Sequence, residues 1–247
     1  MLVRAALVPD TALLVPGAAG SADVLAVLRA AALEAVAEVV GSQARTIVVV
    51  APGPTSRELA GTVRPSLGAA GIPDDLLGWP SEAVTLAHAG ISAPPSVASA
   101  VGLHLLLRAH RRRDLRVVEV TGRERRDDLA ALGSALVTDG PTGLVVVGSG
   151  SGRHGPDAPL ADDPRAPAHD ARVLADLADA GPDARARLAL DDPGLAEELA
   201  VRGWAPWQVL LGAVAGDATV TARLMAAGTE LGAQHAVLVW DPLRDAG

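Results

Sequence analysis

The sequence contains no cysteine, no lysine, no phenylalanine and no tyrosine among its 247 residues. The absence of cysteine excludes disulfide bonds, thiolate metal sites and cysteine nucleophiles. The absence of lysine excludes a Walker-type phosphate site, which needs a lysine beside its glycine-rich loop. Four tryptophans are therefore the only large aromatic residues. Because so few aromatic side chains are present, we expect leucine, valine and alanine to fill the core.

Long apolar segments and basic character are also missing. No apolar run approaches the roughly 20 residues of a membrane span. The N-terminus is interrupted by Pro9 and Asp10 and lacks the continuous hydrophobic region of a signal peptide. The formal net charge of −8 argues against a general nucleic-acid-binding protein, which needs a basic face for phosphates. We therefore expect a cytoplasmic protein with no membrane and no nucleic-acid partner.

The hydrophobic pattern predicts one three-layer α/β/α domain over residues 1–247, with a mostly parallel central sheet. Hydrophobic residues make up 49% of the chain, and apolar strands alternate with helices as in parallel βαβ units. We expect strands at Leu2–Val8, Thr46–Val50, Leu76–Trp79, Val84–Ala87, Leu115–Val120, Leu144–Val147 and Ala236–Trp240. We expect helices at Ala22–Val40 (with Ser21 as N-cap), Ser96–Arg111, Asp127–Leu136, Ala171–Ala180, Gly194–Val201, Pro206–Val214 and Ala218–Ala227.

The stretch from Gly143 to Leu177 is the most informative part of the chain. The unbroken apolar run Leu144–Val147 predicts a strand buried on both faces. It ends in the segment Gly148-Ser149-Gly150-Ser151-Gly152, and Arg153 and His154 follow directly. In an open α/β sheet, ligands bind at the C-terminal end of a central strand. This loop therefore marks the expected binding pocket.

Several side chains of this loop have both a functional and a structural interpretation. His154 is a candidate acid–base or ligand-binding group, or a loop histidine bound to a backbone carbonyl. Arg153 can bind a carboxylate or phosphate, or form a salt bridge with Asp157. Ser149 and Ser151 have no base beside them in the sequence, and the nucleophile motif Gly-x-Ser-x-Gly is absent. The sequence alone therefore disfavours a hydrolase.

Three segments together resemble a known family. They are Ala6–Pro16, Gly148–Val173 with its continuation APLADDPRAPAHDARV, and Leu195–Ala213, which contains the sequence APWQVL. Their order and spacing look like the class III extradiol ring-cleavage dioxygenases of the B-subunit type, especially a branch of hypothetical proteins from GC-rich bacteria. The resemblance implies an Fe(II) ion in active members, held by two histidines and one carboxylate, with a further histidine as acid or base.

The positions that match the family's site carry different residues in this chain. In the family, the first histidine ligand follows the first strand, and Asp10 occupies that position here. The second histidine ligand lies in the turn after the second strand, and that turn contains Gly53 and no histidine here. Gly152 takes the place of the acid–base histidine. The carboxylate position falls near Ala227, with Glu230 the only acid close by. The resemblance therefore predicts a diverged protein that lacks the iron and needs no cofactor.

These observations support three hypotheses about function. The first is that the remnant pocket binds a small molecule or a protein partner. Its candidate residues are Asp10, Gly53, Ser149, Ser151, Arg153, His154 and His235. The second is a metal-dependent oxidoreductase with a rearranged site for Fe(II) or another divalent metal, for which the ligand candidates are Asp10, His154, His235 and Glu230. The third is that the surface around Trp204 and Trp207 mediates assembly, including a homo-oligomer.

Overall fold

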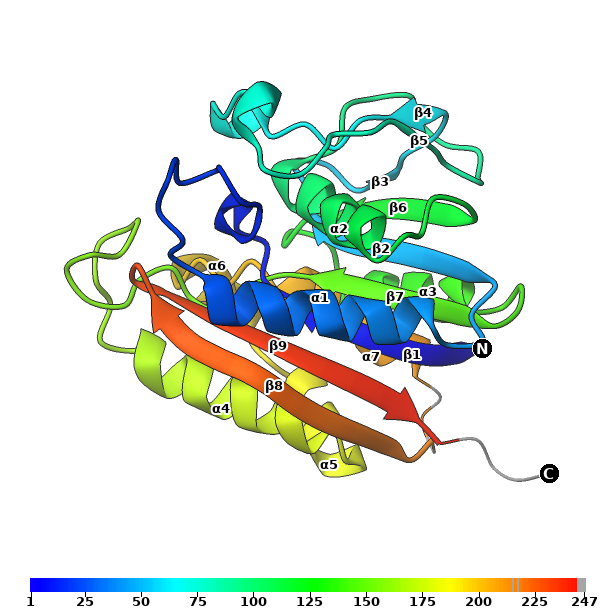
Figure 1. Ribbon diagram of the computed structural model, residues 1–247. Coiled ribbons are helices and arrows are strands. Elements are labelled where there is room, and N and C mark those ends of the chain that lie inside the picture. Colours follow the sequence, from blue (N-terminus) through cyan, green and yellow to red (C-terminus); the bar gives the residue numbers. More distant parts are fainter. Residues whose placement is uncertain (215, 217, 244–247) are drawn as a thin grey trace.

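The computed structural model describes residues 1–214, 216 and 218–243, and a seven-stranded sheet forms its centre. Its strands are β1 (Leu2–Val8), β2 (Thr46–Pro52), β3 (Arg57–Glu58), β6 (Leu115–Val120), β7 (Thr142–Val147), β8 (Val220–Glu230) and β9 (Ala233–Pro242). They lie in the order β3-β6-β2-β7-β1-β9-β8 (Figure 1). The neighbours β6, β2, β7 and β1 pair in parallel, whereas β3, β9 and β8 are antiparallel to their neighbours. A separate small sheet pairs β4 (Thr62–Val63) with β5 (Val84–Thr85).

The parallel centre of the sheet follows from its composition. Every residue of β7 is buried, as are the five central residues of β2, and both strands are rich in valine. Such strands suit a sheet that is covered on both faces. In the register, Val8 pairs with Val147, and Val50 pairs with both Val146 and Val118. The C-terminal ends of β1, β2, β6 and β7 therefore lie together at one edge of the sheet.

Helices cover both faces of this sheet (Figure 1). On one face lie α1 (Ala26–Val40) and α2 (Val97–Arg108), and on the other α3 (Arg126–Leu136), α4 (Ala166–Asp179), α5 (Pro182–Ala189), α6 (Pro193–Glu198) and α7 (Trp204–Ala213). Alternate residues of β1 show the division: Ala6 and Val8 belong to the core under α1 and α2, Ala5 and Leu7 to the other core. None of the helices in the described part of the chain is long and apolar enough to cross a membrane.

Several expected elements have different ends in the structure. The bounds of β1 and β6 are as expected, but α1 begins at Ala26, and Ser21 does not cap it. Successive turns occupy the preceding segment, including a hydrogen bond from Gly20 N to Gly17 O, so the helix starts later. The expected strand at Leu76–Trp79 is wrong, because Leu76 ends a single 3-10 turn instead.

The expected helix at Ala218–Ala227 is wrong, since all of this segment from Val220 onward belongs to the edge strand β8. Alanine, leucine and methionine favour a helix locally. However, Leu231 and Gly232 both have positive φ and form a tight turn that folds β8 back along β9. The backbone pairing of this hairpin outweighs the local preference. The hairpin also reaches the loop after β7, where Gly150 N donates a 2.9 Å hydrogen bond to Gln234 O.

Candidate functional site

A pocket of about 1210 Å³ opens at the C-terminal edge of the parallel strands. Its lining comes from the loops after β1, β2, β6 and β7, from α6 and the start of α7, and from the turn between β8 and β9. This is the edge at which open α/β sheets bind ligands. The lining residues that matter most for its chemistry are Asp10, Gly53, Ser149, Arg202, Glu230 and His235.

Ser149 and His235 form a buried hydrogen-bonded pair in this pocket. Ser149 follows β7 and His235 lies on β9, and Oγ of the serine is 3.0 Å from Nδ1 of the histidine. The serine and histidine are only 4% and 5% exposed. The serine Oγ also accepts a 3.3 Å hydrogen bond from the backbone N–H of Asp10. In the tautomer of His235 that carries its proton on Nε2, the serine hydroxyl donates to Nδ1.

Asp10 connects this pair to a cation. Its carboxylate forms an ion pair with the guanidinium of Arg202, which lies just before α7 and is partly exposed to solvent. The two residues are 192 positions apart in the chain. Arg202 is not among the residues predicted for the pocket, although it stands just before the APWQVL sequence, in a segment that carries the family resemblance. Its place in that segment is the signal by which the sequence could have indicated it.

The environment of His235 keeps its imidazole neutral. Burial lowers the pKa of His235 below its ordinary value, although the charges of Asp10 and Glu230 act in the opposite direction. A neutral imidazole with a free ring nitrogen can accept a proton from a neighbouring hydroxyl. The pocket therefore contains a hydroxyl and a base already in contact.

At the two positions that the resemblance assigns to histidine ligands of iron, Asp10 and Gly53, the surroundings do not fit such a site. The carboxylate of Asp10 is engaged by Arg202. At Gly53, an added Cβ would lie 2.6 Å from Cβ of Glu119, which is fully buried. Oε1 of Glu119 accepts a 2.6 Å hydrogen bond from Ser96 N at the start of α2. A histidine at position 53 would therefore displace a buried carboxylate that holds a helix terminus.

The four ligand candidates of the rearranged metal site do not all lie together. In the ranges that the structure describes, no three or more histidine, aspartate or glutamate side chains are grouped so that they could hold a metal ion. His154 in particular contacts Asp170 and lies outside the lining of the pocket that contains Asp10 and His235.

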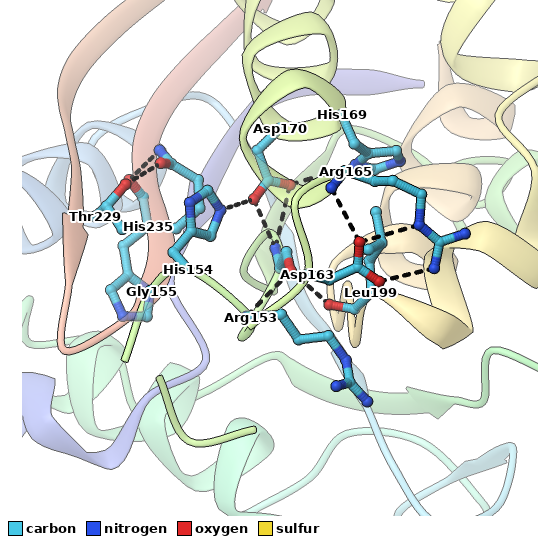
Figure 2. A network of polar contacts seen from close by, with 12 residues as sticks. Arg153, His154, Gly155, Asp163, Arg165, His169, Asp170, Leu199, Thr229 and His235 are labelled. Carbon is cyan, nitrogen blue, oxygen red and sulfur yellow. Dashed lines mark hydrogen bonds and ion pairs between the residues drawn. The ribbon is translucent and has the colours of Figure 1, made fainter. Parts of the chain in front are cut away.

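His154 belongs to a second polar cluster (Figure 2). Its Nε2 atom lies 2.6 Å from Oδ2 of Asp170, on α4. Both carboxylate oxygens of Asp170 accept hydrogen bonds from Ser151 N, at 3.1 and 3.0 Å. Oδ1 of Asp170 also lies 3.4 Å from Nδ1 of His169. Asp170, which is 4% exposed, thus ties the loop after β7 to α4.

Ser151 and Arg153 bond to the backbone near the pocket. Oγ of Ser151 donates a 2.6 Å hydrogen bond to the carbonyl of Leu199, and Nη1 of Arg153 donates a 2.9 Å bond to the carbonyl of Ala161. Asp157, the expected salt-bridge partner of Arg153, lines the pocket instead. Of the seven candidate pocket residues, the structure places four in the lining: Asp10, Gly53, Ser149 and His235.

Trp204 and Trp207 are buried, with 2% and 8% of their surfaces exposed. Nε1 of Trp204 donates a 3.3 Å hydrogen bond to the carbonyl of Asp191, and the residue borders the pocket. Trp207 packs in the core beneath α7. The two side chains form no exposed apolar patch, so the sequence-based argument for an interface at this place does not hold.

His169 bridges two buried carboxylates. Its Nε2 lies 3.3 Å from Oδ2 of Asp191, which also forms an ion pair with Arg172. Burial disfavours the charged imidazole, but Asp170 and Asp191 outweigh it and raise the pKa of His169 to about 9. Burial likewise opposes ionisation of Asp191, but His169 and Arg172 prevail and lower the pKa of that carboxyl.

Stability is therefore expected to fall at high pH. The contribution of His169 is complete below its unfolded pKa of 6.5 and is lost as the pH rises through about 9. The contribution of Asp191 is present above 3.8 and is lost as the pH falls through its lowered pKa. We expect the free energy of unfolding, measured with urea, to be on the order of 1–3 kcal/mol smaller at about pH 10 than at about pH 6.

The composition narrows the set of groups that titrate in this range. Because the chain has no cysteine, tyrosine or lysine, the side chains that titrate between these pH values are the histidines, and the N-terminal amine joins them. In the variant His169→Gln the difference between the two pH values should shrink markedly. An undiminished difference in that variant would show that another group is responsible.

Comparisons with known proteins bear on the fold alone. No protein-family model matches the chain, and no curated protein matches it. The fold is similar to a solved structure described as that of an uncharacterized protein, JW3007, from Escherichia coli K12, with a TM-score of 0.50 and 16% sequence identity. The match covers 97% of this chain and 99% of that chain, so the likeness extends over the whole fold.

Proposed function

We propose that this chain is a single three-layer domain that binds a neutral, largely apolar small molecule at the C-terminal edge of its sheet. In this proposal it is a diverged relative of the extradiol dioxygenases that binds no iron. The observation that carries the proposal is the pocket of about 1210 Å³, in which Ser149, His235 and Asp10 form one hydrogen-bonded group. A large concave pocket with a few convergent polar groups is the usual form of a small-molecule site.

The walls of the pocket supply apolar contact from several elements. Leu13 comes from the loop after β1, Val97 from the start of α2, Trp204 from the start of α7 and Leu231 from the hairpin turn. Burying the apolar surface of a ligand against such side chains stabilises the complex by about 25 cal/mol per Å². The polar group formed by Ser149 and its partners is then available to orient a carbonyl or hydroxyl group of the ligand.

The charges around the pocket disfavour an anionic ligand. Among the described residues that line it, two arginines stand against four carboxylates; these are Arg123, Arg202, Asp10, Asp157, Glu197 and Glu230. Arg202 is already paired with Asp10. A phosphate or carboxylate ligand would have to compete for that arginine and approach the other carboxylates. A neutral ligand avoids both costs.

Dye binding tests this proposal. We expect Nile red, a neutral apolar dye, to bind the EDTA-treated protein saturably, with a rise in dye fluorescence. We expect anilinonaphthalene sulfonate, which is anionic, to bind with an affinity lower by a factor of about ten or more. A factor of ten corresponds to a difference in binding free energy of about 1.4 kcal/mol. Equal affinity for the two dyes would contradict the proposed ligand chemistry.

A pocket-filling variant locates the binding. Ala233 lies two residues before His235 on β9, hence on the same face, and lines the pocket. Ala233→Trp places an indole in the pocket and should abolish saturable binding of Nile red. The matched control is Ala227→Trp, at an exposed position of β8 outside the lining. Unchanged binding by the Ala233 variant would place the dye elsewhere.

A further inference from the structure

The pocket holds a serine and a histidine arranged as a nucleophile and its base. The distance of 3.0 Å from Oγ of Ser149 to Nδ1 of His235 lies within the reach required for proton transfer between such groups. The N–H of Asp10 donates to the same Oγ and holds the oxygen in place, and the tautomer of His235 with its proton on Nε2 leaves Nδ1 able to take the hydroxyl proton. Both side chains belong to residues that line the pocket. A ligand bound there can therefore meet the hydroxyl.

The backbone around Ser149 is held on both sides. Gly203 N donates a 2.8 Å hydrogen bond to the carbonyl of Ser149, which ties it to the start of α7. Gly150 N donates to Gln234 O at 2.9 Å, which ties the next residue to β9, the strand that carries His235. The relative position of hydroxyl and imidazole is thus set by three elements of the fold. Such preorganisation is what a reactive pair needs.

We propose that Ser149 is a nucleophile activated by His235 and that the protein hydrolyses small neutral esters with an apolar acyl or alcohol group. This inference rests on the proposed function, because the ester occupies the same pocket. The absence of the sequence motif Gly-x-Ser-x-Gly does not oppose it. The base lies 86 residues further along the chain and reaches the serine through the pairing of β9 in the sheet.

The chemistry proceeds in two balanced steps. Oγ of Ser149 bonds to the carbonyl carbon of the ester while its proton passes to Nδ1 of His235. The carbon–oxygen bond to the alcohol then breaks, and the alcohol leaves with the proton from Nδ1. Water attacks the acyl-serine in the same way, which releases the carboxylic acid and restores the serine hydroxyl.

The charged groups that face His235 favour these steps. Asp10 and Glu230 stabilise the imidazolium that forms when Nδ1 takes the proton, while burial keeps the ring neutral beforehand by lowering its pKa.

Covalent labelling tests the inference. Diisopropyl fluorophosphate, a neutral apolar reagent, should modify Ser149 specifically, as located by peptide mass spectrometry. The labelling rate should fall by about 10²–10⁴-fold in His235→Gln, which keeps the serine but removes the base. In the unmodified sequence the rate should rise with pH, with a midpoint below the ordinary histidine value of 6.5.

Two controls separate this inference from the proposed function. Ser151→Ala removes a buried serine two residues away, whose hydroxyl bonds to a backbone carbonyl outside the pocket lining, and should be labelled at the normal rate. Ser149→Ala should lose the label and still bind Nile red. If the reagent labels a different residue, or if His235→Gln is labelled at an undiminished rate, while Nile red still binds, the assignment of Ser149 as a nucleophile is wrong and the proposed function stands. If Nile red does not bind saturably to the protein with its natural sequence, the proposed function itself is wrong.

Discussion

Asp170→Ala is expected to lower the free energy of unfolding by about 3–5 kcal/mol, measured by urea denaturation near neutral pH. The carboxylate is buried and is shared by Ser151 N, His154 and His169. The raised pKa of His169 keeps its ring charged at this pH, and its side chain is only 2% exposed. Removing Asp170 leaves that charge with one carboxylate partner and leaves a buried amide without its acceptor.

Two variants control for the loss of charge and for substitution in general. Asp170→Asn retains the shape and an acceptor oxygen, so its destabilisation should be smaller than that of the alanine variant. Asp183→Ala removes an exposed aspartate from the first turn of α5 and should change stability by no more than about 0.5 kcal/mol. If Asp170→Ala behaved like Asp183→Ala, the polar cluster would contribute little to holding the loop after β7.

Trp207→Ala is expected to cost about 3–5 kcal/mol of unfolding free energy, also measured with urea. The side chain is 8% exposed, and its ring lies against the backbone of Gly203, where an added Cβ would come within 2.2 Å of it. Its removal leaves a large cavity between α7 and the sheet, and the surrounding core can collapse only partly.

The size of this effect can be checked against milder changes. Trp207→Phe fills most of the cavity and should recover much of the lost stability. Leu190→Ala removes a 73% exposed leucine just after α5 and should be close to neutral. A near-neutral Trp207→Ala would mean that the indole lies at a surface, contrary to the packing described above.

The elements that are predictable from the sequence are those with strong local boundaries. The strand β1 is a largely apolar run that ends directly before Pro9-Asp10, and α2 begins directly after Ser96, whose side chain caps it. The strand β8 lacks such signals. Its alanines, leucine and methionine suit a helix, and only pairing with β9 after the turn at Leu231 and Gly232 makes it a strand.

The candidate site shows the same division. Asp10, Ser149 and His235 can be chosen from the sequence because they stand at strand ends or in loops where pockets form. Their partners cannot be read from spacing. The partner of Asp10 is 192 residues away, and that of Ser149 is 86 residues away. Glu119 is visible as one charge in an apolar strand, but only the structure shows it occupying the space beside Gly53.

By itself, the sequence determined the α/β class, the mostly parallel sheet and the edge at which the pocket opens, because apolar periodicity and turn residues act over a few neighbours. Its composition also excluded cysteine and lysine chemistry. The tertiary structure alone decided that Arg202 neutralises Asp10, that His154 binds Asp170, and that His235 meets Ser149. Those pairings depend on the order of the strands in the sheet and on which side chains the fold buries together. Neither the strand order nor the burial of a side chain can be read from the number of residues that separate two positions in the sequence.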